Sequence, residues 1–129
     1  DAGTCITLDL LTEKGNYLGG NITPGIEMRF KAMHTFTARL PLIDRKEQED
    51  WIGKSTETAM RNGGQLGAIL EVKAFIQMCR RKYQGLNVIL TGGDADFFAK
   101  NLKTKIFANH NLVLVGLNKI LKHNVQLLE

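Results

Sequence analysis

The first 38 residues predict a β-hairpin that leads into a helix, and this opening constrains the fold more than any other part of the chain. Residues 1–11 (DAGTCITLDLL) and 17–22 (YLGGNI) have strand composition, and the TEKGN between them is a turn sequence. Apolar residues then recur at helical spacing, so we expect a helix from about Pro24 to Ala38. Pro24 suits the first helical position and Thr23 suits the N-cap.

Helices and short strands alternate through the rest of the chain. A long helix is expected from Ser55 to about Tyr83, although Gly63, Gly64 and Gly67 each weaken it by about 1 kcal/mol relative to alanine. Something packed closely against these glycines would explain them. The other expected elements are, in order, an edge strand or packed loop at 40–43, a buried strand at 86–90, a helix at 94–101, a short strand at 106–107 and a closing helix at 112–123. This order predicts an α/β fold.

The composition indicates one globular domain. The chain has 129 residues, a formal net charge of +4 and 43% hydrophobic residues. Basic residues are spread along the chain, so we expect no nucleic-acid partner, and no apolar run approaches the length of a membrane span. Without a signal peptide, the cytoplasm is the expected location. Cys5 and Cys79 lie far apart and are both expected to be buried thiols.

Two glycine-containing turns are candidate ligand sites. LNVIL followed by TGGDA is a strand, a glycine turn and a helix start, where Gly92 and Gly93 would let backbone N–H groups approach a nucleotide. A plain tight turn explains that pattern equally well. The turn formed by Asp1, Gly3 and Thr4 is more specific, because a carboxylate suits a hard cation while glycine and threonine groups suit phosphate oxygens.

Other polar residues are expected to be structural. Asp9 is expected to be solvated, and the three histidines (His34, His110 and His123) have no partner at metal-ligand spacing. Thr56, in the STETA sequence, could simply cap the long helix. The Arg80–Lys82 run is expected at a helix C-terminus, where positive charge is favourable.

Five ordered motifs resemble a known family. DAGTCITLD, GGNITPG, TARLP, GKSTETAMRNG and TGGDA occur at the intervals found in the C-terminal half of type III pantothenate kinase. That family belongs to the actin-like ATPase superfamily, with sugar kinases and heat-shock chaperones. The resemblance implies an α/β, ribonuclease H-like domain whose mixed sheet opens with an antiparallel hairpin and is flanked by helices. Residues 1–129 would then be one domain, the C-terminal lobe of a two-lobed kinase.

The resemblance also implies roles for individual residues. Asp1 matches the ligand of a monovalent cation, potassium or ammonium, and Thr4, with Gly3 beside it, matches the ATP contact. Gly92 and Gly93 match the glycine pair near the adenosine. Thr56 matches the pantothenate contact. ATP with Mg²⁺ is the implied cosubstrate.

The implied activity is ATP-dependent phosphorylation of pantothenate to 4'-phosphopantothenate, the first step of coenzyme A biosynthesis, by a homodimer. The family's general base lies in a Gly-x-Asp-Arg motif of the N-terminal half, which does not occur here, so we expect no catalytic base in this chain and an inactive fragment. Val115 stands where the family often has an acidic residue. A regulatory or transcription-accessory protein is an alternative. A sugar kinase is another, although the pairing of STETA with GGNITPG argues against it.

Overall fold

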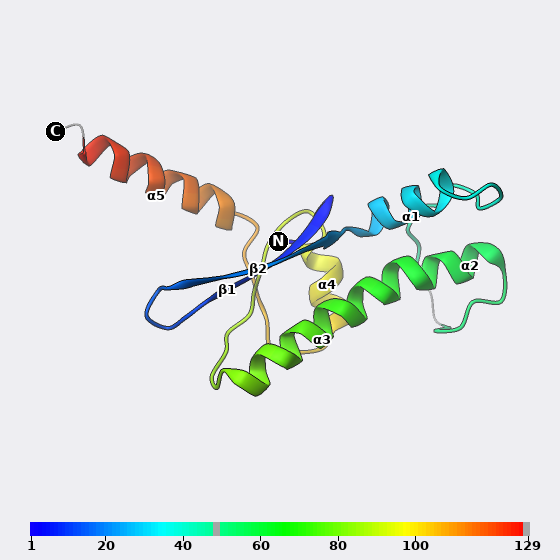
Figure 1. Cartoon of the computed structure of the whole chain (residues 1–129), viewed down its shortest axis with the longest axis horizontal. Coiled ribbons are helices and arrows are strands. Elements are labelled where there is room, and N and C mark those ends of the chain that lie inside the picture. Colours follow the sequence, from blue (N-terminus) through cyan, green and yellow to red (C-terminus); the bar gives the residue numbers. More distant parts are fainter. Residues whose placement is uncertain (48–49, 128–129) are drawn as a thin grey trace.

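The chain folds into α/β structure, as the sequence predicts. The computed structural model describes residues 1–47 and 50–127. Its elements (Figure 1) are β1 (Cys5–Leu11), β2 (Tyr17–Pro24), α1 (Ile26–Thr35), α2 (Thr56–Arg61), the π-helical segment η1 (Asn62–Leu66), α3 (Gly67–Lys82), β3 (Ile89–Leu90), α4 (Ala95–Leu102), β4 (Phe107–Ala108) and α5 (Leu112–Gln126).

The strands form two small sheets. β1 pairs with β2 in antiparallel fashion, and β3 pairs with β4 in parallel. The expected single mixed sheet is therefore wrong for the described residues. Backbone hydrogen bonds from Ala2 N to Thr91 O and from Asp94 N to Ala2 O, both 2.8 Å, tie the start of the chain to the end of β3. Apart from these hydrogen bonds, β1 and β3 are not paired with one another in the described residues, so the two sheets remain separate.

Helix α1 begins later than its sequence indicates. Pro24 is the last residue of β2, where it pairs with Cys5, and the N-cap is Gly25 rather than Thr23. Gly25 N donates to Thr4 O at 2.9 Å, which keeps the chain extended through this point. The expected Thr23 cap is therefore wrong, and the Thr23 hydroxyl instead accepts a hydrogen bond from Arg29 Nη2. The helix ends at Thr35, and residues 40–43 form a loop with a buried Ile43.

The long helix after Ser55 is confirmed, with an irregular turn inside it. Helical backbone runs through α2, η1 and α3 from Thr56 to Lys82. A Cβ atom on Gly64 would lie 2.3 Å from the Phe30 ring, so a glycine there lets α1 pack against η1. This close contact explains one of the three glycines, whereas Gly63 and Gly67 face open space.

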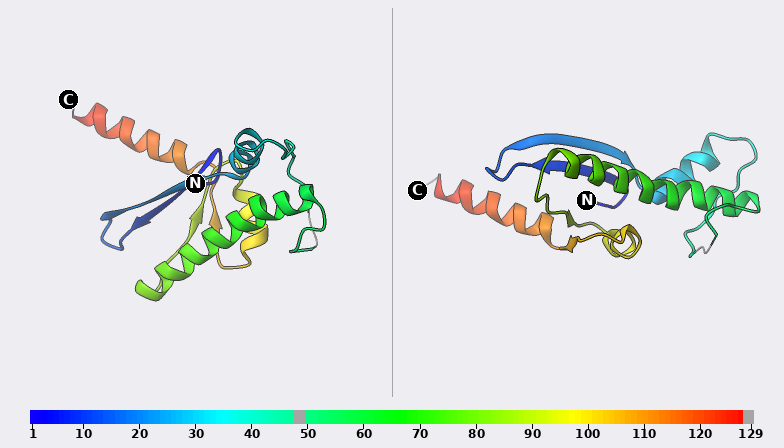
Figure 2. Two further views of the ribbon diagram at one scale, coloured as in Figure 1. Left: turned by 45° about the vertical axis from the view of Figure 1, so that its right-hand side comes forward. Right: turned by 90° about the horizontal axis from the view of Figure 1, so that it is seen from below.

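The core lies where α1, α3 and α4 meet the start of the chain. Its largest fully buried side chains are Phe30, Phe98, Ile26 and Leu102. Cys79 is buried as expected, but Cys5 is only half-buried, because it lies near the end of the hairpin. In contrast, α5 buries none of its residues and extends away from the other helices (Figures 1 and 2). Among the described helices, none has the length and apolar character needed to span a bilayer.

Candidate functional site

Residues 1–4 form a tight turn that folds back on β1. Asp1 N donates to Thr7 O at 3.0 Å and Thr7 N donates to Asp1 O at 2.9 Å, which is the reciprocal pattern of an antiparallel pair. Gly3 N donates to Cys5 O at 2.9 Å and closes the turn. Thr4 is exposed at its tip. The turn is therefore fixed by its backbone, while the Thr4 side chain is open to solvent.

The TGGDA loop packs directly on this turn. Gly92 has a φ of +95°, which non-glycine residues rarely adopt. A Cβ atom there would lie 2.3 Å from Ala2 O and 2.5 Å from Asp1 Oδ1. Figure 1 shows the N-terminus beside the yellow segment that leads into α4. The structure thus brings Asp1, Gly3 and Gly92 together, although they lie some 90 residues apart in sequence.

Thr4 and Gly93, the other two predicted ATP contacts, belong to this turn and this loop. Gly25 N donates to Thr4 O, so the GGNITPG segment closes the other side of the turn. Gly93 is exposed, and a Cβ atom on it would meet nothing within 4 Å. Thr4 and Gly93 are therefore both open to solvent, whereas Ala2 is buried.

Thr56 lies at the start of α2, apart from the turn at residues 1–4 and the TGGDA loop (Figure 1). It is the first residue of α2, which packs against η1 and α1, and Figure 1 shows α2 beside α1 on the side away from the β1–β2 turn. Ser55, not Thr56, caps this helix: its Oγ accepts from Thr58 N at 3.2 Å, and Ser55 N donates to Thr58 Oγ1 at 2.9 Å. The capping interpretation of Thr56 is therefore wrong. Its hydroxyl is exposed and has no capping role.

The Asp1 carboxylate lies against the glycine turn. In the part of the chain that the structure describes, no group of three or more His, Cys, Asp or Glu residues could hold a metal ion together. Asp1 Oδ1 and Ala2 O, both hard oxygen donors, pack against the Gly92 backbone.

The residues expected to be structural lie at the surface. Asp9 is exposed and accepts a hydrogen bond from the Tyr17 hydroxyl at 2.7 Å, and this bond raises the pKa of Tyr17. His34 Nδ1 contacts Leu40 O, and His110 lies 3.2 Å from Asp96. His123 is exposed on α5. These positions agree with surface roles.

The sequence did not reveal two residues of this region. Arg45 reaches from the loop after α1 to Asp94, with 2.8 Å between Nη1 and Oδ1. Thr91 is 4% exposed, and its Oγ1 has no hydrogen-bond partner within residues 1–47 and 50–127. No local pattern marks Arg45, since it stands in an irregular charged segment. Thr91 could have been suspected from its place beside the glycine pair.

A cavity of about 490 Å³ opens behind the turn. It lies between β1 and the segment around β3, and α3 and α4 close it. Its lining is mainly apolar, with Asp1 and Thr91 at one end. The unpartnered Thr91 hydroxyl belongs to a residue of this lining.

Comparisons with known proteins identify the family of this chain. The family model for type III pantothenate kinase matches residues 1–78. Proteins named type III pantothenate kinase from Christiangramia forsetii and Bacteroides fragilis are 50% and 49% identical over 124 residues, 96% of this chain and 51% of each relative. The chain thus spans about half the length of these curated relatives.

A solved structure has the same fold. The crystal structure of a Campylobacter jejuni protein, described as a Baf family transcriptional activator, superposes with a TM-score of 0.70 at 28% identity. The match covers 97% of this chain and 56% of that one. With the family model matching more than half of the residues and with relatives at about half identity, the chain belongs to the type III pantothenate kinase family.

Proposed function

We propose that this chain is the C-terminal lobe of an ATP-dependent pantothenate kinase with an actin-like ATPase fold, which forms 4'-phosphopantothenate in the first step of coenzyme A biosynthesis. The observation that carries this proposal is the contact between the DAGT turn and the TGGDA loop in a chain of this family. A turn with free hydroxyl and backbone groups, beside a glycine loop at a helix start, is a suitable place for a nucleotide.

Phosphoryl transfer depends on positioning the substrates and neutralising charge, and three groups of residues in this chain would share that work. Gly3 and Thr4 bind ATP phosphate oxygens, and Gly92 and Gly93 hold the adenosine. Thr56 contacts pantothenate, whose primary hydroxyl attacks the γ-phosphate. The general base is supplied by the other lobe, so residues 1–129 alone bind but do not catalyse.

Asp1 would hold a monovalent cation, potassium or ammonium. Such a cation supplies positive charge beside the phosphates. Mg²⁺ arrives with the nucleotide, because its preferred ligands are phosphate oxygens and water rather than a single carboxylate. We further propose that the protein is a cytoplasmic homodimer without a nucleic-acid or membrane partner.

A regulatory role is the second candidate. The Campylobacter jejuni protein is described as a Baf family transcriptional activator, and it shares this fold over 97% of the chain. A regulator on this fold would bind DNA or another protein through a surface outside the glycine turns.

The experiment is an assay of the full-length protein. We expect ADP release that depends on both ATP and pantothenate, and mass spectrometry should detect the phosphorylated product. Residues 1–129 alone serve as the inactive control. Turnover with a hexose instead of pantothenate would favour a sugar kinase, and DNA binding without turnover would favour the regulator.

A further inference from the structure

We propose that Arg45 is a positioning residue for the nucleotide loop 91–94: it acts through Asp94 and sets the affinity for ATP. This inference rests on the proposed function, because it takes Gly92 and Gly93 as the adenosine cradle. Arg45 belongs to none of the motifs that carry the family resemblance.

Three partners surround the Arg45 side chain. Nη1 lies 2.8 Å from Asp94 Oδ1, and the guanidinium lies over the Phe97 ring at 5.2 Å from its centroid. Nε is 3.8 Å from Glu27 Oε1. The side chains of Arg45 and Asp94 are only 28% and 15% exposed, so this pair is less screened by solvent than a surface ion pair.

The Asp94 carboxylate pairs with Arg45 and does not cap its own helix. It occupies the N-cap position of α4, where aspartate usually accepts a backbone hydrogen bond, but its side chain makes no capping bond. Its backbone N–H donates to Ala2 O at 2.8 Å. Asp94 is thus held by the turn through its backbone and by Arg45 through its carboxylate.

Arg45 joins the two segments that flank the candidate phosphate turn. Glu27 lies in the first turn of α1, two residues after Gly25, whose N–H donates to Thr4 O. Asp94 directly follows Gly93 on the other side. Arg45 therefore spans from the α1 side to the loop side of the site.

The glycine loop depends on such anchors because Gly92 and Gly93 have no side chains with which to fix themselves. Removing the guanidinium leaves the Asp94 carboxylate largely buried without its partner, which is a costly state. The loop would relieve that cost by moving, and a shift of about 1 Å at a binding loop is enough to weaken a substrate interaction. The predicted pantothenate contact, Thr56, lies away from this loop and would be spared.

The test compares Arg45→Met, Arg45→Lys and Asp94→Asn in the full-length protein, with ATP binding measured by calorimetry and both KM values by steady-state kinetics. We expect Arg45→Met to weaken ATP binding and raise the ATP KM at least fivefold, with the pantothenate KM changed less than twofold. Arg45→Lys should recover part of the loss. The double variant Arg45→Met with Asp94→Asn should be no worse than Arg45→Met alone, because both changes remove one interaction.

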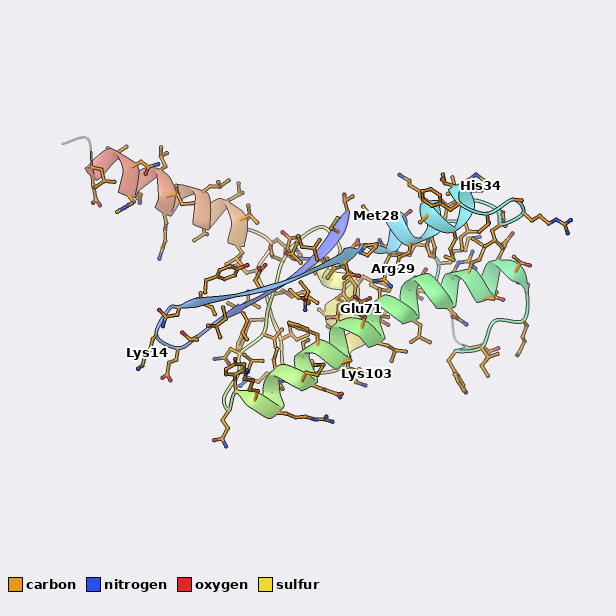
Figure 3. The ribbon with its side chains drawn as sticks, in the orientation of Figure 1. Lys14, Met28, Arg29, His34, Glu71 and Lys103 are labelled. Atoms are coloured by element: carbon orange, nitrogen blue, oxygen red, sulfur yellow. The ribbon has the colours of Figure 1, made fainter. Side chains whose placement is uncertain are left out.

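The matched control is Glu71→Gln, which removes another ion pair of the same lobe. Arg29 of α1 and Glu71 of α3 face one another and form an ion pair (Figure 3). This variant should lower the melting temperature without changing ATP affinity. If Arg45→Met behaves like Glu71→Gln, or if both KM values rise equally, the inference is overturned. A wild-type protein that binds no ATP would overturn the proposed function as well.

Discussion

Two neighbouring residues at the start of α2 have separable roles. Ser55 forms the capping box with Thr58, whereas Thr56 makes no capping bond. We expect Ser55→Ala to lower the free energy of unfolding by about 1 kcal/mol and to leave the pantothenate KM unchanged. Thr56→Ala should do the reverse: the stability should stay within about 0.5 kcal/mol while the pantothenate KM rises. Chemical denaturation and kinetics on both variants measure these effects.

Thr56→Ser is the control for this pair, because it keeps the hydroxyl and removes only the methyl group. A normal pantothenate KM in Thr56→Ala would remove Thr56 from the site. A large loss of stability in Thr56→Ala would mean that the start of α2 depends on more than the Ser55 cap.

The glycine pair offers a second contrast at single residues. Gly92→Ala should lower the free energy of unfolding by more than about 1 kcal/mol, because the backbone has φ +95° and the new methyl group would overlap Ala2 O. Gly93→Ala meets no neighbour within 4 Å, so its stability should change little. If Gly93 contacts adenosine, the ATP KM should nevertheless rise. Equal stability of the two variants would contradict the packing described for Gly92.

At the scale of elements, the helix from α2 to α3 contains one glycine that packing requires and two that face open space. Gly64→Ala should destabilise the protein by more than about 1 kcal/mol, because its methyl group would meet the buried Phe30 ring. Gly67→Ala should stabilise it by roughly 0.5–1 kcal/mol, since the site is helical and open. Urea denaturation of the full-length protein distinguishes the two. A stabilising Gly64→Ala would mean that η1 can move away from α1.

Local patterns predicted most elements but not how they begin and end. Periodicity placed the long helix, and turn residues placed the hairpin. Thr23 failed as a cap because strand pairing between Cys5 and Pro24, a tertiary effect, extends β2 past it. The π-helical segment has no simple pattern of its own, because it arises where Gly64 meets Phe30 on another helix.

At the scale of the whole molecule, the resemblance grouped residues that are far apart in the sequence, and their roles in a ligand site stay predictions. It linked Asp1 and Thr4 with Gly92, and the structure places these residues in one region. Arg45 was missed because its partner is fixed by the tertiary fold and not by any spacing in the sequence. The predicted pantothenate contact of Thr56 stays a prediction, since no contact in the described residues tests it.

Helix α5 has the least packing against the rest of the described structure. Its 15 residues bury no side chain in the described structure, and an isolated helix of this length is marginal in water. In residues 1–129 alone, we expect amide hydrogens of α5 to exchange much faster than those of α3. Hydrogen-exchange mass spectrometry measures both helices in one experiment. Protection of α5 equal to that of α3 would show that it is covered in solution.

The hydrogen bonds between Ala2 and residues 91 and 94 also have a consequence for the order of folding. They close a loop of about 90 residues, and the entropy lost in such a closure grows with loop length to roughly 4 kcal/mol. Contacts of that kind form late, after local helices and the hairpin. During synthesis the turn at residues 1–4 therefore makes these contacts only after the TGGDA loop has left the ribosome, so the proposed nucleotide site forms only then.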